Sequence, residues 1–384
     1  MSYIVGDLIK KAKIEKCKKQ DFPVLSMTMK DGIVFQNDRF KKQIASIDKS
    51  SYNIVKRNQL VVSFPIDEGV LAVQDIIDFG IVSPAYKIWD INDYLVIPKF
   101  LEAFLRSPHS IQYYKSKLHG STARRRTITD SDLLQMEVPL VSFTEQKRIL
   151  ENIRKVKHII THRRTQLEKL DLLVKARFVE MFGDPVSNPM NWSKMILKEL
   201  STKIGSGATP KGGKESYGTE GISLIRSMNV HNGVFEYKDL AYISDEQAEK
   251  LNNVTIESDD VLLNITGASV ARCCIVPNEI LPARVNQHVC VIRCKDIINP
   301  IFLNNILIDE NYQELLWAIA GSGATREAIT KQQVENLSII LPPLELQTQF
   351  ADFVKQVDKS KVAVQKALDE AQLLFDSLMQ EYFG

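Results

Sequence analysis

Three consecutive arginines lie in a short segment that is otherwise rich in small and hydroxyl-bearing residues. This segment, GSTARRRTIT, covers residues 120–129 of the 384-residue chain and follows lysines and a histidine. Guanidinium groups bind phosphates or, bidentately, guanine edges, and small residues let backbone N–H groups approach phosphates. The first candidate DNA contacts are therefore Lys117, His119, Ser121, Thr122, Arg124, Arg125 and Arg126.

A second set of polar residues lies in the second half of the chain, around the glycine-rich segment GSGATPKGGK (residues 205–214) and the string RVNQH (residues 284–288). Asn and Gln can read adenine, whereas Lys and Arg favour guanine or phosphate. Any one of these residues alone is more typical of a solvated surface side chain, and it is their clustering that favours binding. The candidates are Lys203, Ser206, Thr209, Lys211, Lys214, Arg226, Arg272, Arg284, Asn286, Gln287, His288, Thr325 and Arg326.

The sequence lacks the motifs of common catalytic sites. It has no G-x-x-x-x-G-K-[ST] phosphate loop, no [DNS]-P-P-[FYW] segment of an amino-methyltransferase, no H-E-x-x-H and no Ser/His/Asp order with a glycine elbow. The five cysteines include no C-x-x-C pair, which favours buried free thiols over a zinc site. We expect no catalytic residue, metal or cofactor in this chain.

Composition sets broad limits on the class of protein. The chain is 44% hydrophobic and 25% charged, as is typical of globular proteins, and its net charge is +2. Nucleic-acid binding must therefore depend on how the charge is distributed. No stretch approaches ~18 consecutive apolar residues and the N-terminal segment lacks the features of a secretion signal, so we expect a cytoplasmic protein.

An internal repeat positions these polar segments. Shifting the chain by 201 residues aligns residues 120–183 with 321–384 without a gap, and 15 of the 64 positions are identical. The identities include parts of GSTARRRTIT and GSGATREAIT, the pair Gln146 and Gln347, and the closing Phe-Gly of each copy. This period is too long for a solenoid repeat and indicates two tandem halves.

Each copy ends in a segment whose apolar residues follow a 4-3 spacing, which predicts a long helix with a coiled-coil stripe. Residues 141–183 hold ten basic and five acidic side chains (10 − 5 = +5), and residues 342–384 hold four and seven (4 − 7 = −3). Opposite charges favour pairing of the two helices with each other, with two independently solvated helices as the alternative. The residues expected to pair are Ile149, Ile153, Val156, Ile160, Leu167, Leu170 and Val174 with Val354, Val357, Val364, Leu368, Phe375 and Leu378.

The order of these features resembles the DNA-specificity subunit of Type I restriction-modification systems over essentially the whole chain. Each half has a divergent region, the phrase G-S-x-x-x-R-x-x-I-T, a hydrophobic strand, a glutamine at the helix entrance and a long helix ending in Phe-Gly. The segments LSMTMKDGI and GSGATPKGG look like the openings of two target-recognition domains. The first copy departs from the pattern, because it lacks the Pro-Pro of LPPLELQ and a glycine-rich opening loop, so contacts are not transferred between the two domains.

The resemblance implies an α+β fold with two tandem mixed α/β target-recognition domains, residues 1–140 and 184–342. Two spacer helices, 141–183 and 343–384, would pair as an antiparallel coiled coil and give the molecule an internal pseudo-twofold repeat. The chain would be non-catalytic and read a bipartite double-stranded DNA target, one half per domain, with the gap set by the helices.

The resemblance also implies partners. These are two methyltransferase (modification) subunits that carry S-adenosylmethionine and methylate adenine, and restriction/translocase subunits that use ATP and Mg²⁺. The alternative is a protein-interaction scaffold whose paired helices recruit a partner and whose mixed domains never touch DNA. Salt-sensitive DNA binding would separate the two hypotheses.

Overall fold

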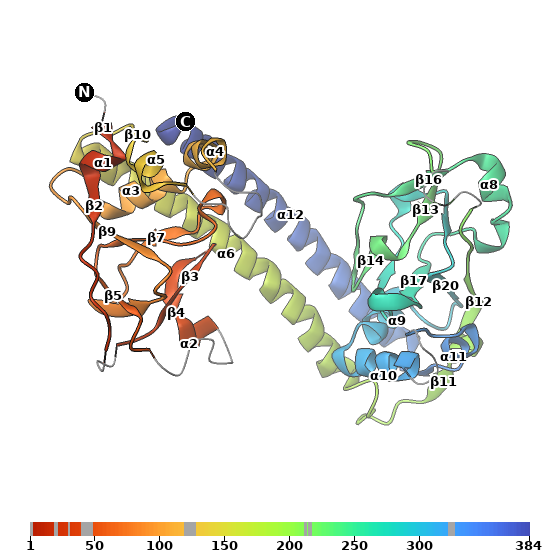
Figure 1. Ribbon diagram of the computed structural model, residues 1–384. Coiled ribbons are helices and arrows are strands. Elements are labelled where there is room, and N and C mark those ends of the chain that lie inside the picture. Colours follow the sequence, from red (N-terminus) through yellow and green to blue (C-terminus); the bar gives the residue numbers. More distant parts are fainter. Residues whose placement is uncertain are drawn as a thin grey trace. The chain divides into compact units, whose positions relative to one another are not determined.

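The computed structural model describes residues 3–18, 22–29, 31–39, 49–118, 128–210, 213, 217–321 and 327–384. Its elements divide into two compact units (Figure 1): unit 1 is Met1–Thr165 with Gln365–Gly384, and unit 2 is Gln166–Val364. Each unit combines a strand-rich region with part of both long helices, because apolar residues of both helices enter its core. The units therefore do not end where the predicted domains end, and the predicted domain division stays a prediction.

Unit 1 is built from short strands and helices. Its strands are β1 (Tyr3–Ile4), β2 (Ile9–Lys11), β3 (Leu25–Thr28), β4 (Gly32–Phe35), β5 (Asn53–Lys56), β6 (Leu60–Val62), β7 (Leu71–Val73), β8 (Phe79–Val82), β9 (Lys87–Ile91) and β10 (Glu137–Val138). Its shorter helices are α1 (Val5–Leu8), α2 (Gln36–Arg39), α3 (Pro98–Leu105), α4 (Pro108–Ser116) and α5 (Asp130–Leu134).

The main sheet of unit 1 has the strand order β2-β9-β6-β7 and is antiparallel. Every residue of β6 and β7 is buried, and neighbouring residues belong to different cores. Leu60 packs with Phe100 and Phe104 of α3, whereas Val61 packs with Val55 and Ile33. Alternation of side chains along a strand explains why these short segments read as continuous hydrophobic runs: both faces of the sheet are covered.

Unit 2 repeats this plan. Its strands are β11 (Lys194–Ile196), β12 (Ser201–Ser206), β13 (Ile222–Ile225), β14 (Val230–His231), β15 (Val234–Phe235), β16 (Ala241–Ile243), β17 (Val261–Asn264), β18 (Cys273–Ile275), β19 (Ala283–Val285), β20 (Val289–Cys294) and β21 (Ser338–Ile340). Its shorter helices are α7 (Leu197–Leu200), α8 (Asp245–Glu249), α9 (Pro300–Leu307), α10 (Glu310–Gly321) and α11 (Lys331–Glu335).

The main sheet of unit 2 has the order β12-β20-β17-β18, the same as that of unit 1 when equivalent strands are matched. The β11–β21 pair likewise corresponds to β1–β10. The units differ beside the main sheet. Unit 2 has a three-stranded sheet, β16-β13-β19, in which β13 and β19 run parallel, whereas unit 1 has the pairs β3–β4 and β5–β8.

Both predicted long helices are present, as α6 (Phe143–Phe182) and α12 (Leu344–Phe383), each with 40 residues. After α6, Gly183 has φ +74°, a left-handed helix end that glycine adopts without strain. Each helix begins in one unit and ends in the other. Phe182, which closes α6, packs against Phe302 and Phe350 in unit 2, and Phe383, which closes α12, packs against Phe100 in unit 1.

Segments of the two long helices contact each other inside each unit. In unit 1, Val156 and Ile160 of α6 share a core with Ala371 of α12, and Leu368, Phe375 and Leu378 pack beside them. In unit 2, Val174 of α6 belongs to the same core as Val354 and Val357 of α12, with Leu170 packed against it. Ile149 and Ile153 are buried instead in the core of unit 1 that contains Phe100, and Leu167 and Val364 are half-buried.

Charge contributes to the contacts between the two long helices less simply than the sequence suggests. The sequence predicts that basic side chains of α6 face acidic side chains of α12, but an ion pair in unit 2 has the reverse polarity, with Lys361 Nζ of α12 2.7 Å from Asp171 Oδ1 of α6. Burial by itself would lower the pKa of Lys361, but hydrogen bonds and charge from Asp171 and Asp358 raise it overall. No helix within the described residues is both long and apolar enough to span a membrane.

Candidate nucleic-acid interface

Half of the predicted DNA contacts lie outside the described residues. They are His119, Ser121, Thr122, Arg124, Arg125, Arg126, Lys211, Lys214, Thr325 and Arg326. Lys117 is described and is exposed at the C-terminal end of α4. The structure therefore bears on the candidates mainly in unit 2.

The described parts of the two repeated phrases belong to the scaffold. Ile128 and Ile329 are buried, with exposed fractions of 5% and 2%. Thr129 and Thr330 cap α5 and α11: the hydroxyl of Thr129 accepts a hydrogen bond from the Asp132 backbone N–H at 3.0 Å, and Thr330 makes the equivalent contact to Gln333 N at 3.2 Å. In each copy, the isoleucine is therefore part of the core and the threonine that follows it caps a short helix.

The repeated glutamines have an equally definite structural role. Gln146 is fully buried; its Oε1 accepts from Ile97 N at 2.8 Å, and its Nε2 donates to Val141 O at 2.9 Å. Gln347 is also fully buried and makes the matching bonds to the N–H of Asn299 (2.9 Å) and the carbonyl of Pro342 (2.8 Å). Ile97 and Asn299 are the N-caps of α3 and α9, so each glutamine ties the start of a long helix to the same place in its unit.

Three predicted residues of unit 2, Thr209, Gln287 and His288, form a row of polar contacts with Thr266, which was not predicted. Thr209 Oγ1 donates a hydrogen bond to Gln287 Oε1, Gln287 Nε2 lies 3.1 Å from His288 Nε2, and His288 Nδ1 lies 2.6 Å from Thr266 Oγ1. These four residues come from the loop after β12, the loop between β19 and β20, and the turn between β17 and β18. Thr209 and Gln287 are exposed. We name Thr209, Gln287, His288 and Thr266 the polar row.

A glycine allows these loops to approach each other. Gly207 N donates to Asn286 O at 3.1 Å, and a Cβ added at Gly207 would lie 1.7 Å from the Val285 carbonyl oxygen. No side chain fits in that space, so the glycine is required for the loop after β12 to lie against the end of β19. Close packing of the two loops therefore explains one glycine of the glycine-rich segment, Gly207.

Arg226 lies at the end of β13, next to the same loop. Because β13 and β19 are parallel, their carboxyl ends meet at one edge, and Asn286 N donates to Ile225 O at 3.0 Å. The Arg226 guanidinium carbon is 5.4 Å from the ring centroid of Tyr217, and its Nη2 donates to the Asp239 carbonyl. This half-buried cation is held over the Tyr217 ring directly after β13, the strand that pairs with β19.

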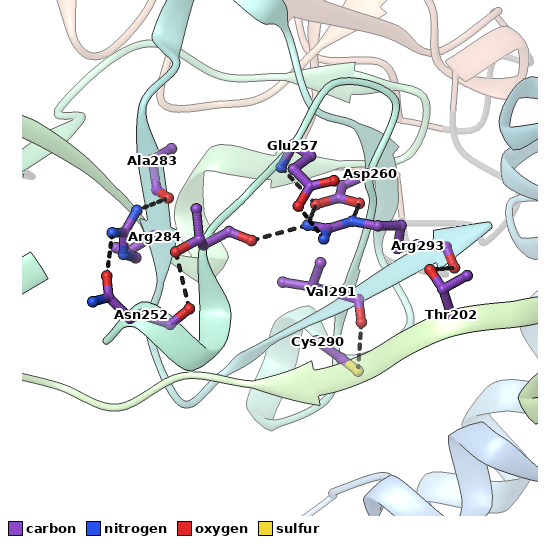
Figure 2. Close-up of polar contacts among 10 residues, drawn as sticks. Thr202, Asn252, Glu257, Asp260, Ala283, Arg284, Cys290, Val291 and Arg293 are labelled. Atoms are coloured by element: carbon purple, nitrogen blue, oxygen red, sulfur yellow. Dashed lines mark hydrogen bonds and ion pairs between the residues drawn. The ribbon is translucent and has the colours of Figure 1, made fainter. Parts of the chain in front are cut away.

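Arg284 and Asn286 require a correction of the sequence-based interpretation. Arg284 is only 8% exposed, and it donates to Ala248 O (3.1 Å), Ala283 O (3.0 Å) and Asn252 Oδ1 (2.9 Å), contacts partly drawn in Figure 2. Asn286 is 6% exposed, and its Oδ1 accepts from His288 N at 3.0 Å. Both side chains hold the scaffold in place, and their burial argues against the predicted DNA contacts.

The other predicted residues of unit 2 that the structure describes are Ser206, Arg272 and Lys203. Ser206 is exposed at the end of β12, and Arg272 is half-buried in the β17–β18 turn, directly before β18. Lys203 is half-buried within β12, where burial, and next the positive charge of Arg293, lower its pKa.

A charged network that the sequence did not single out holds the main sheet of unit 2. Figure 2 shows the Arg293 guanidinium of β20 between Asp260 and Glu257. Its Nε and Nη2 each donate to an Asp260 carboxylate oxygen at 2.8 Å, and Nη1 donates to Glu257 Oε1. Asp260 is fully buried, so this bidentate pair fixes the entry to β17 against β20.

The sequence-based prediction of the interface also did not include Tyr217, which lies under Arg226, or Thr266, which contacts His288. Each stands directly before a glycine, Gly218 and Gly267, and a polar or aromatic residue beside a turn glycine was the signal that could have found them.

Four of the five cysteines, Cys17, Cys273, Cys274 and Cys290, are buried. Burial raises the pKa of the Cys274, Cys290 and Cys294 thiols to about 12, which keeps them protonated and unreactive at neutral pH. In the part of the chain that the structure describes, no three His, Cys, Asp or Glu side chains are grouped so as to hold a metal ion.

Comparison with known proteins identifies a domain in the second half of the chain. Residues 189–371 match the family described as the Type I restriction modification DNA specificity domain. The chain carries a Type I DNA specificity domain. This match supports the family that the order of the sequence features resembles.

Known relatives and solved structures are consistent with the assignment of a specificity domain. The EcoBI specificity subunit of a Type I restriction enzyme from Escherichia coli is 22% identical over 304 residues, which are 71% of this chain and 62% of that subunit. The match therefore spans less than two thirds of the relative's length. The Type I S subunit from M. genitalium has a TM-score of 0.60 at 14% identity, covering 100% of this chain and 96% of that one.

A chain from a structural study of complex assembly and conformational transition in the type I R-M system also has a TM-score of 0.60. It is 18% identical and covers 100% of this chain and 97% of its own length. At these identities the likeness concerns the fold: a mixed α/β architecture with long helices.

Proposed function

We propose that this chain is the sequence-specific DNA-binding subunit of a Type I restriction-modification complex and reads a bipartite double-stranded target, one half per recognition domain. The observation that carries this proposal is the shared strand order of the two units, β2-β9-β6-β7 and β12-β20-β17-β18, with different side chains at the turns. One binding site needs no second copy of the frame, whereas two divergent copies suit two different half-sites. Specificity subunits of Type I systems are generally non-catalytic, and we propose the same for this chain.

The long helices are proposed to pair as an antiparallel coiled coil that fixes the gap between the half-sites. Support comes from the packing of Val156 with Ala371 in unit 1 and of Val174 with Val354 in unit 2. A helix of 40 residues is about 60 Å long at ~1.5 Å per residue. That length suits half-sites separated by one to two turns of DNA, each turn being ~34 Å.

The proposed partners follow from the repeat. Two equivalent frames in one chain can present equivalent surfaces to two identical methyltransferase subunits, although the two DNA half-sites differ. S-adenosylmethionine would be carried by those subunits, and ATP with Mg²⁺ by restriction/translocase subunits in a cleaving complex. The complex would act in the cytoplasm.

Exchange of residues 1–140 for the recognition domain of another specificity subunit tests the modular proposal. Adenine methylation mapped across the host genome by single-molecule sequencing should show a change in one half of a two-part motif, with the other half and the gap retained. A change in both halves would contradict modular recognition. A wild-type chain that directs no two-part motif and shows no salt-sensitive DNA binding would support the scaffold alternative.

The proposal that the helices set the gap between the half-sites is tested by inserting four residues, about one helical turn, after Lys169. The gap in the methylated motif should lengthen while both halves stay the same. An unchanged gap would show that the helices do not set the spacing.

The arginine segment is tested by replacing Arg124, Arg125 and Arg126 together with alanine. DNA binding should weaken, and the slope of log K against log salt should flatten by about 0.9 for each phosphate that the variant no longer neutralises. The matched control replaces the exposed Lys355, Lys359 and Lys366 of α12, which removes the same charge from a helix. Equal slopes for the arginine variant and the wild type would exclude the proposed phosphate contacts.

A further inference from the structure

We infer that Gln287 reads an adenine in the half-site bound by the second recognition domain, and that Thr209 and His288 are its positioning residues. The inference rests on the proposed function and assigns one base contact within it. It is carried by the geometry of the polar row, in which an exposed amide is held at one end by Thr209 from another loop and at the other end by its neighbour His288, which itself contacts Thr266 of a third loop.

The contacts fix the orientation of the amide. Thr209 donates to Gln287 Oε1, and Gln287 Nε2 lies 3.1 Å from His288 Nε2. An amide Nε2 can only donate, so His288 Nε2 must accept, and the imidazole carries its proton on Nδ1. That Nδ1–H then donates to Thr266 Oγ1 at 2.6 Å, which completes a continuous row of donors and acceptors.

The backbone beneath the row is also held. The His288 N–H donates to Asn286 Oδ1 at 3.0 Å, and Gly207 N donates to Asn286 O at 3.1 Å. Because Asn286 is buried and bonded to the loop after β12, Gln287 projects from a fixed loop. An exposed side chain on such a support loses little freedom when it binds, which favours selective recognition over a general polar contact.

A count of the remaining hydrogen-bonding groups identifies the base. After these contacts, Gln287 keeps one lone pair on Oε1 and one N–H on Nε2. Adenine presents the matching pair in the major groove, the N6 amino donor and the N7 acceptor, and Gln binds it bidentately. Guanine presents two acceptors there, so it would leave the free lone pair of Oε1 opposed by an acceptor.

The experiment selects bound sequences from double-stranded DNA libraries randomised in both half-sites, using the full chain in complex with its methyltransferase subunits. Wild type should yield a two-part motif, and its absence would count against the proposed function itself. The Gln287→Ala variant should lose about tenfold or more of the preference for adenine at one position of the second half and retain all other positions. Gln287→Glu should shift that same position toward cytosine, whose N4 amino group donates to a carboxylate.

Two further variants separate positioning from contact. Thr209→Val and His288→Phe should reduce discrimination at the same position by less than Gln287→Ala does, without altering other positions. Lys203→Ala is the matched control for general electrostatic loss, and it should weaken all sequences equally. If Gln287→Ala selects the wild-type motif with unchanged preferences, or weakens every sequence uniformly, the assignment of Gln287 as an adenine reader is overturned.

Discussion

Units 1 and 2 place different polar pairs at equivalent positions of their main sheets. In unit 1, Gln59 stands directly before β6 and donates its Nε2 to Asp90 Oδ1 of β9 at 2.7 Å. In unit 2, Asp260 stands directly before β17 and forms the bidentate ion pair with Arg293 of β20. The strand registers make the two pairs equivalent, since Leu60 faces Trp89 and Val261 faces Ile292 in the next position of each ladder.

The turn that Gln59 closes in unit 1 and the turn that Asp260 closes in unit 2 have the same hydrogen bond. Gln59 Oε1 accepts from Lys56 N at 2.7 Å, and Asp260 Oδ2 accepts from Glu257 N at 2.8 Å, three residues back in both cases. Any side chain with an acceptor at that place can close the turn, so the backbone was retained while the cross-strand partner diverged from an amide–carboxylate contact to an ion pair. The frame constrains geometry more than it constrains charge.

The turns beyond those strands differ even more. The β6–β7 turn of unit 1 carries Asp67 and Glu68, whereas the β17–β18 turn of unit 2 carries Thr266 and Arg272. Acidic side chains oppose phosphates and a basic one attracts them. A shared frame with turns of opposite charge is consistent with two domains that contact their targets through different loops.

The largest expected difference between the units comes from breaking the polar pairs. Asp260→Ala leaves the Arg293 guanidinium without its buried carboxylate, and should destabilise unit 2 by about 3 kcal/mol. Gln59→Ala removes the bonds that an uncharged amide makes to Lys56 N and Asp90 Oδ1 in unit 1, and should cost about 1 kcal/mol. Hydrogen–deuterium exchange of β17 and β6 in the two variants measures each destabilisation locally, and equal values would mean that the ion pair adds nothing to the frame.

The buried glutamines should behave alike, because they make the same contacts in both units. Gln146→Ala and Gln347→Ala each leave buried backbone groups without a partner and should each cost about 2 kcal/mol, measured by urea denaturation. Gln356→Ala, an exposed glutamine of α12, is the control and should have little effect. A cost that differs between the two buried sites by more than ~1 kcal/mol would show that their equivalence is geometric and not energetic.

The helix caps provide a smaller matched pair. Thr129→Ala and Thr330→Ala each remove the side-chain acceptor for the first turn of α5 or α11, and each should lower the free energy of unfolding by about 1 kcal/mol. Thr129→Ser and Thr330→Ser keep the acceptor and should restore most of that stability in the same urea titration. If serine fails to restore it, the threonine methyl group, and not the cap, stabilises the helix start.

The smallest expected effect is a pH dependence confined to unit 1. Burial by itself would raise the pKa of Asp130, but hydrogen bonds from Lys87 and Lys11, and their charges, lower it overall from its ordinary value of 3.8. The lowered folded-state pKa means that this stabilisation is present above pH 3.8 and is lost as the pH falls below it. The pair is about one-third exposed, so its contribution is about 0.5 kcal/mol.

The position equivalent to Asp130 in unit 2 is Lys331, which carries no carboxyl group. Asp130→Asn should therefore remove the stability difference between pH 6 and pH 3 that belongs to this site, as measured by thermal unfolding at both pH values. An Asp130→Asn variant with the full wild-type pH dependence would place the titration elsewhere.

The amino-acid sequence by itself determined the features that depend on neighbours along the chain. The 4-3 apolar spacing predicted α6 and α12, and the Phe-Gly that closes the first copy marks where α6 ends. Periodicity and capping are local, so they can be read without knowledge of the fold. The repeat likewise pointed to Gln146 and Gln347 before their contacts were known.

Only the tertiary structure decided what depends on distant partners. It pairs β12 with β20 and β2 with β9, it buries Arg284 and Asn286, and it brings Thr209 and Thr266 to either side of the loop that holds Gln287 and His288. A polar residue in a loop looks the same in sequence whether it faces solvent or satisfies a buried carbonyl. Which of these it does is set by strands far away in the chain, because burial and hydrogen-bond satisfaction belong to the packed molecule.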